Sequence, residues 1–141
     1  MKTLFIPLKL KSSISKKRIL EISKKLPKEI ALVYSIQFEE IAKQIKEILS
    51  NVHNITLFTQ VLGCSKPKIP KQTQALLLIG SGEFHALSLG LELNLPIYIL
   101  ESNNFRKIPS SQVEALIKKK KVLYMKFLIS KKIGVIISTK Q

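Results

Sequence analysis

The sequence predicts an α/β fold: a three-layer domain with a parallel sheet of about four to five strands and helices on both faces. Short apolar runs alternate with longer segments in which apolar residues recur at helical spacing, as in βαβ units. The run Ala75–Ile79 is continuously apolar, which is typical of a strand covered on both faces. The 141 residues are 45% hydrophobic, enough for one domain with a buried core.

The first half of the chain predicts three strands separated by two amphipathic helices. Aliphatic runs mark the strands, and apolar residues at i, i+3, i+4 spacing mark the helices. Ser15 is a suitable residue to cap the first helix, and Pro27 ends it. In chain order these elements are the strand Thr3–Ile6, a helix reaching about Leu26, the strand Glu29–Ser35, the helix Gln37–Leu49 and the strand Ile55–Phe58.

The second half continues the alternation after a loop that contains two prolines. A last helix, capped by Ser110 or Ser111, is expected to run with a break to Ile129. The last predicted strand has no following helix, so it looks like the start of another domain. We therefore predict one α/β domain over residues 1–128, followed by a linker and strand over 129–141. In chain order these elements are the strand Ala75–Ile79, the helix Glu83–Leu93, the strand Ile97–Leu100, the last helix and the strand Ile133–Thr139.

The chain is strongly basic, with 24 Lys and Arg residues against 9 acidic ones and a formal net charge of +15. Nucleic acid, an acidic protein surface and an anionic small molecule are all candidate partners for such a charge. Aromatic residues make up only 6%, which favours solvated helix faces over nucleic-acid binding for the lysine clusters. The apolar runs are shorter than the roughly 20 residues of a membrane span, and no signal peptide is evident, so we expect a cytoplasmic protein without membrane contact.

Cys64 is the only cysteine, so no intrachain disulfide can form, and the chain cannot build a zinc or iron–sulfur site unaided. It follows Gly63 in a loop after a predicted strand, and ligands of α/β sheets usually bind in such loops. A lone cysteine is also commonly a small buried hydrophobic residue. The residue by itself leaves both interpretations open.

The turn Gly80-Ser81-Gly82-Glu83-Phe84-His85 joins a buried strand to a helix. Glycines let the backbone approach a ligand, and a helix N-terminus offers free N–H groups to a carboxylate or phosphate. The turn is neither a P-loop nor a full dinucleotide fingerprint. Taken alone, the turn is weak evidence for a ligand, because many such turns only pack a helix against a sheet. His85 is by itself more typical of a half-buried structural histidine than of a ligand donor.

Together these segments resemble the middle domain of archaeal diphthamide synthase, and the end of the chain is similar to the start of that enzyme's third domain. The resemblance spans essentially the whole chain and is most specific over residues 60–100. It is carried by Gln60-Val61-Leu62-Gly63-Cys64, the strand Ala75–Ile79, the turn Gly80–His85, Leu95-Pro96-Ile97 and the closing Ile133–Lys140.

The resemblance implies a non-canonical S-adenosylmethionine enzyme of three similar α/β domains, each giving one cysteine to a 4Fe–4S cluster. Its reduced cluster cleaves S-adenosylmethionine to release a 3-amino-3-carboxypropyl radical. The radical adds to a histidine of translation elongation factor 2, the first step of diphthamide biosynthesis. The open fourth iron would bind the cofactor's amino and carboxylate groups.

By position, Cys64 matches the metal-binding cysteine of the middle domain. The resemblance places Gly80, Ser81, Gly82 and His85 beside S-adenosylmethionine, while Gln60 and Gly63 would shape the cysteine's loop. No residue is assigned a catalytic role.

The sequence departs from the family in lacking a first domain and nearly all of the third. We therefore expect a transferase component that is inactive as an isolated chain, whether it is a split subunit, a fragment or an excised domain. Its partners would be chains that carry the missing domains and two further cysteines. The alternative is a non-catalytic basic module that binds RNA or an acidic protein.

Overall fold

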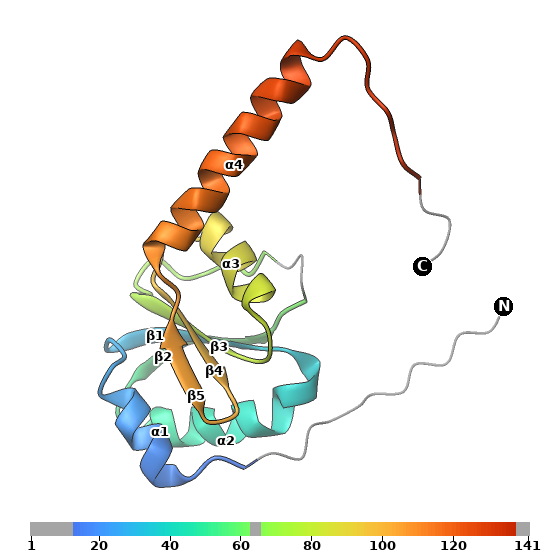
Figure 1. The fold of residues 1–141 in the computed structure, drawn as a ribbon. Coiled ribbons are helices and arrows are strands. Elements are labelled where there is room, and N and C mark those ends of the chain that lie inside the picture. Colours follow the sequence, from blue (N-terminus) through green and yellow to red (C-terminus); the bar gives the residue numbers. More distant parts are fainter. Residues whose placement is uncertain (1–12, 63–65, 138–141) are drawn as a thin grey trace, which may run out of the picture.

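Five strands form one sheet at the centre of the computed structural model, which describes residues 13–62 and 66–137 (Figure 1). The strands are β1 (Glu29–Tyr34), β2 (Asn54–Gln60), β3 (Ala75–Ile79), β4 (Ile97–Glu101) and β5 (Asn104–Lys107). Their order across the sheet is β2-β1-β3-β4-β5, and the first four run parallel. The predicted α/β class and strand number are confirmed.

Strand β5 is a correction to the wholly parallel sheet that the sequence predicts, because it pairs antiparallel with β4 at the edge. A tight hairpin joins the two strands, with Ser102 in the left-handed region at a φ of 53°. The segment Asn104–Lys107 has a single apolar residue, Phe105, so no apolar run marks it as a strand. An edge strand needs fewer apolar residues because a smaller part of it is covered.

The two central strands are β1 and β3, and both are apolar on each face as predicted. All five residues of β3 are buried, and so are the four inner residues of β1. Leu32 pairs with Leu77, and Val33 pairs with Leu78. Because successive side chains point to opposite faces, these strands supply both cores of the domain.

One face of the sheet is covered by α1 (Lys16–Ser23) and α2 (Glu39–Leu49) (Figure 1). The predicted cap is confirmed, because the Ser15 hydroxyl accepts a hydrogen bond from the Arg18 backbone N–H at 3.2 Å. Helix α1 ends at Ser23, three residues before the expected Leu26. A 3-10 turn over Ile36–Phe38 precedes α2 and replaces the first turn of the predicted helix.

The other face is covered by α3 (Glu83–Glu92) and by the first turns of α4 (Ser110–Ile129). Beyond these turns, α4 projects away from the sheet (Figure 1). The predicted break is absent, since the helix is continuous over its 20 residues. Neither Ser110 nor Ser111 caps it: Pro109 holds the N-cap position with extended backbone, so Ser110 is already the first helical residue.

The expected strand Ile133–Thr139 is not formed in its described part. Residues 131–137 carry no regular secondary structure and are exposed, and a strand forms only beside another strand with which it can pair. Ser138 and Thr139 lie outside the described residues, as does the predicted strand Thr3–Ile6. The division at residue 128 stays a prediction.

Candidate functional site

The parallel strands β1, β2 and β3 end at one edge of the sheet. Tyr34, the last residue of β1, pairs with Gln60 at the end of β2 and with Ile79 at the end of β3. The loops that carry the sequence-predicted site residues therefore leave the same edge of the sheet, from the two strands that flank β1. The β2 loop begins with Val61 and leads in sequence to Gly63-Cys64, and the β3 loop begins with Gly80.

This edge contains the point where the order of the strands reverses. From β1 the chain passes through α2 to β2 on one side, and it then crosses to β3 on the other side of β1. The reversal lies between β1 and β3, where helices on opposite faces diverge. Ligands of open α/β sheets bind in the crevice at such a point. The Gly80 turn lies directly at this position.

Ser35 follows β1 at the reversal point and lies against Gly80. Its backbone N–H donates to the Ile79 carbonyl at 3.2 Å, which extends the pairing of the two strands by one residue. A Cβ on Gly80 would lie 2.9 Å from the Ser35 hydroxyl oxygen. That oxygen is buried, and it has no hydrogen-bond partner among the described residues. The sequence predicts Ser35 at the end of a strand but not its contact with Gly80. The only sign of that contact in the sequence is a small polar residue directly after a buried run.

The turn itself combines one buried and two exposed residues. Gly80 is buried, and its N–H donates to the Leu100 carbonyl at 3.2 Å. Ser81 and Gly82 are exposed. Gly82 has a φ of 85° and holds the N-cap position of α3 without any side-chain cap. The first N–H groups of α3 therefore find no acceptor on the N-cap residue, and a helix N-terminus of this kind favours an anion.

Glu83, the first residue of α3, forms an ion pair with Arg106 on β5. Both side chains are about two-fifths exposed, at 40% and 37%. The contact ties the start of α3 to the antiparallel edge strand, across β4. Arg106 was missed by the sequence analysis because β5 was missed. It neutralises the one acidic side chain in the first turn of this helix.

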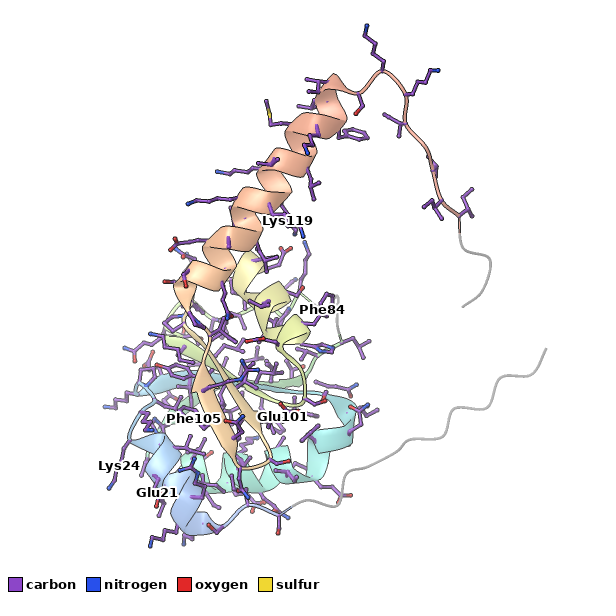
Figure 2. The ribbon with its side chains drawn as sticks, viewed as in Figure 1. Glu21, Lys24, Phe84, Glu101, Phe105 and Lys119 are labelled. Atoms are coloured by element: carbon purple, nitrogen blue, oxygen red, sulfur yellow. The ribbon has the colours of Figure 1, made fainter. Side chains whose placement is uncertain are left out.

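Phe84 and His85 follow at the start of α3. The Phe84 ring is 72% exposed and points away from the body of the protein (Figure 2). The His85 ring lies edge-on to it, with ring centroids 6.0 Å apart, and the residue is half-buried. His53, by contrast, has its Nδ1 2.8 Å from the Pro27 carbonyl, which is typical of a structural histidine. His85 thus remains the histidine available to a ligand.

The structure brings Gly80, Ser81, Gly82 and His85 together, whereas Cys64 lies outside the described residues. After that gap, the ammonium group of Lys66 forms an ion pair with Glu92 of α3, at 3.0 Å. Within residues 13–62 and 66–137, no three His, Cys, Asp or Glu side chains gather as a metal site. Since the chain has one cysteine, it can give a cluster one thiolate.

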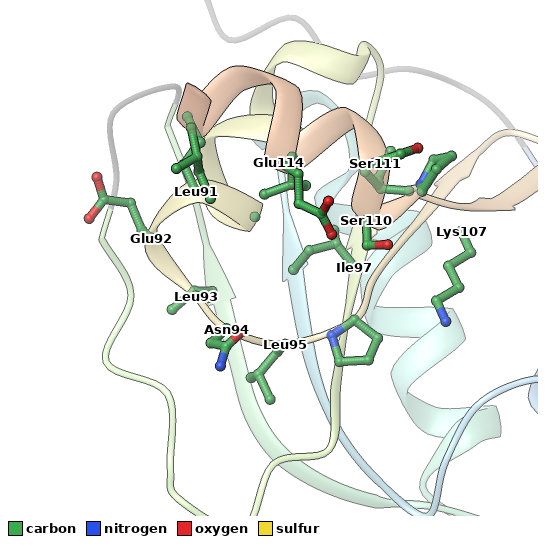
Figure 3. A pocket seen from close by; sticks show the side chains of 16 residues that line it. Leu91, Glu92, Leu93, Asn94, Leu95, Ile97, Lys107, Ser110, Ser111 and Glu114 are labelled. Carbon is green, nitrogen blue, oxygen red and sulfur yellow. The ribbon is translucent and has the colours of Figure 1, made fainter. Parts of the chain in front are cut away.

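A groove of about 810 Å³ lies at the opposite edge of the sheet, where α3 ends and β4 begins (Figure 3). Leu93, Asn94 and Leu95 form one wall, and the first turns of α4 form another. Because it opens at the amino end of β4, this groove is separate from the candidate site. In the described ranges, no helix is long and apolar enough to cross a membrane.

Comparisons with known proteins point to one family. The family model described as "Putative diphthamide synthesis protein" matches residues 1–141. The chain is 28% identical to the 2-(3-amino-3-carboxypropyl)histidine synthase of Methanocaldococcus jannaschii, over all of this chain and 41% of that protein. It also resembles the crystal structure of Dph2 from Pyrococcus horikoshii, with a TM-score of 0.63 and 28% identity over 76% of this chain and 34% of that one. The match of the family model over residues 1–141 shows that this chain belongs to the diphthamide synthesis protein family.

Proposed function

We propose that this chain is one component of an iron–sulfur, S-adenosylmethionine-dependent 3-amino-3-carboxypropyl transferase that modifies a histidine of translation elongation factor 2. The name of the Methanocaldococcus jannaschii relative supports the reaction. The chain spans 41% of that relative and 34% of the Dph2 chain, so we propose the activity for the whole fold to which these residues contribute one domain. We expect it to work in the cytoplasm.

Cys64 would supply one of the three thiolates that hold a 4Fe–4S cluster. The observation that supports this assignment is the carboxyl edge that β2 and β3 share, because the chain leading to Cys64 and the Gly80 turn both start at this edge, on either side of β1. When bound, the cluster would cleave S-adenosylmethionine, which supplies the group to be transferred. The other two thiolates would come from the first and third domains. Residues 129–141 would form the beginning of the third domain, and the rest would lie on other polypeptide segments.

The Gly80 turn would hold the cofactor. Exposed Ser81 and Gly82 bring backbone close to a ligand, and the uncapped N-terminus of α3 favours a carboxylate such as that of S-adenosylmethionine. The ion pair to Arg106 keeps Glu83 from opposing that negative charge. His85, in the first turn of the helix, would donate to the same ligand.

Iron content after anaerobic reconstitution tests the assignment of Cys64. The intact chain and the Cys64→Ala variant are compared, each with and without added thiols or partner polypeptides, and Ser65→Ala serves as the matched control. We expect iron with the intact chain and the control, and none with Cys64→Ala. Equal iron in all three would remove Cys64 from the cluster.

The alternative function, a basic module for RNA or an acidic protein, makes a different prediction. The four lysines at 118–121 are exposed on α4, and they would release counterions on binding a polyanion. Such binding would weaken steeply with salt and would be unaffected by Cys64→Ala. Undetectable RNA binding at low salt would take away the main support for this alternative.

A further inference from the structure

The outer half of α4, residues 122–129, carries an unusual amount of exposed apolar surface. Figure 2 shows this part of the helix standing clear of the domain, with side chains on all sides. Its large apolar side chains are each between 53% and 77% exposed. They are Val122, Leu123, Tyr124, Met125, Phe127, Leu128 and Ile129.

These apolar residues surround the helix rather than forming a stripe. At about 100° per residue, Leu123 and Phe127 lie on one side, and Met125 and Ile129 lie on nearly the opposite side. A helix that is apolar all round is normally buried within a larger structure. Nearer the domain, Val113 and Leu116 are half-buried, and α4 packs there against α3. The outer half therefore needs a partner that encloses it on several sides.

We infer that the outer half of α4 is the docking element for the part of the diphthamide synthase fold that this sequence does not contain. This inference rests on the proposed function, because it identifies where the missing domains bind. The supporting fact is the 41% coverage of the Methanocaldococcus jannaschii relative, which leaves more than half of that protein unmatched.

Charge argues against a second copy of this chain as the occupant. The lysines at 118–121 border the apolar segment and are exposed, and the chain carries a net charge of +15. Paired α4 helices would bring these lysine clusters into the same contact region, where like charges repel. The fitting partner is an apolar cleft bordered by acidic side chains.

A membrane surface fits the geometry less well than a protein cleft does. An interfacial helix buries one apolar face and keeps a polar face in water. The outer half of α4 has a single charged residue, Lys126, so a bilayer surface would leave much of its apolar surface in water.

Capture from an extract of the source organism tests the docking site. The full 141-residue chain is immobilised, and mass spectrometry quantifies retained chains of the diphthamide synthase family that carry the unmatched parts of the fold. We expect the double variant Leu123→Glu/Phe127→Glu to retain roughly tenfold less, the scale of loss for central interface residues. Val52→Glu is the matched control, because Val52 is similarly exposed, at 52%, but lies outside α4. Circular dichroism confirms that every variant keeps its fold.

Capture of no such family chain, or equal capture by the double variant, would overturn the inference. Dimerisation in light scattering, or sedimentation with vesicles containing anionic lipid, would also overturn it if the double variant abolished either one. The Cys64→Ala variant separates this inference from the proposed function. Docking predicts full capture by Cys64→Ala, whether or not that variant loses iron.

Discussion

Ser35 and Gly80 face each other where β1 and β3 end, so closely that a Cβ on Gly80 would lie 2.9 Å from the Ser35 hydroxyl oxygen. The contact lies at the reversal point of the strand order, where the candidate ligand turn begins. Gly80 is therefore required by close packing, and it sets how near the turn approaches the end of β1. The functional turn and the packing of the sheet depend on the same pair of residues.

Gly80→Ala is expected to lower the free energy of unfolding by about 1–3 kcal/mol, the usual cost of overpacking. Ser35→Ala is expected to change it by less than about 1 kcal/mol, because the hydroxyl that is removed is buried without a partner among the described residues. The double variant should recover most of the loss, since the Ser35 Cβ lies 3.6 Å from the added Cβ. Urea unfolding of all four proteins measures this coupling.

Gly82→Ala is the control for this cycle. Its cost arises from the φ of 85°, and nothing lies within 4 Å of an added Cβ. Its destabilisation should therefore be the same in the natural chain and in the Ser35→Ala background. Additive effects of Gly80→Ala and Ser35→Ala would show that the proposed contact does not limit position 80.

Arg106→Gln is expected to loosen the start of α3 without unfolding the domain. The pair with Glu83 is part-exposed, so its loss should cost no more than about 1 kcal/mol of global stability. Hydrogen exchange at residues 81–84 should become faster, because β5 no longer anchors the turn. Lys43→Gln, which breaks the ion pair with Glu39 on α2, should leave exchange in this turn unchanged. The same exchange rates in both variants would refute the anchoring role.

The two histidines are expected to respond in opposite ways to substitution by alanine. His53→Ala should lower the unfolding free energy by about 1–2 kcal/mol, because it removes the hydrogen bond to the Pro27 carbonyl and leaves a small void. It should leave transferase activity per folded molecule unchanged. His85→Ala should keep the stability and reduce the activity of the assembled enzyme. Unchanged activity in His85→Ala would remove this residue from the proposed site.

The central strands were predictable because they are buried on both faces. Runs such as Ala75–Ile79 have one plausible place in an α/β domain, and the helices between them follow from apolar periodicity. Strand β5 was not predictable in this way, because its pairing depends on the neighbouring β4 and on a hairpin with Ser102 at a positive φ. The closing strand shows the reverse error: residues 133–137 have a β-type composition, but composition cannot supply a strand to pair with.

Part of the candidate site could be predicted from the sequence. Gly80, Ser81 and Gly82 stand out because glycines flank a turn between a buried strand and a helix. Ser35 and Arg106 are distant in sequence from that turn, and only the strand order brings them to it. The surface of α4 shows a related limit, since apolar residues at helical spacing predict a buried helix but do not identify what buries it.

The most direct test of the proposed function replaces Cys64 with alanine at the chromosomal gene, with Ser65→Ala as the matched change. Mass spectrometry of translation elongation factor 2 then measures the 3-amino-3-carboxypropyl group on its modified histidine. We predict that the group is lost in Cys64→Ala cells and kept in Ser65→Ala cells, while both variant chains accumulate normally. An unchanged modification in Cys64→Ala cells would contradict the assignment of this chain as a cluster-bearing component.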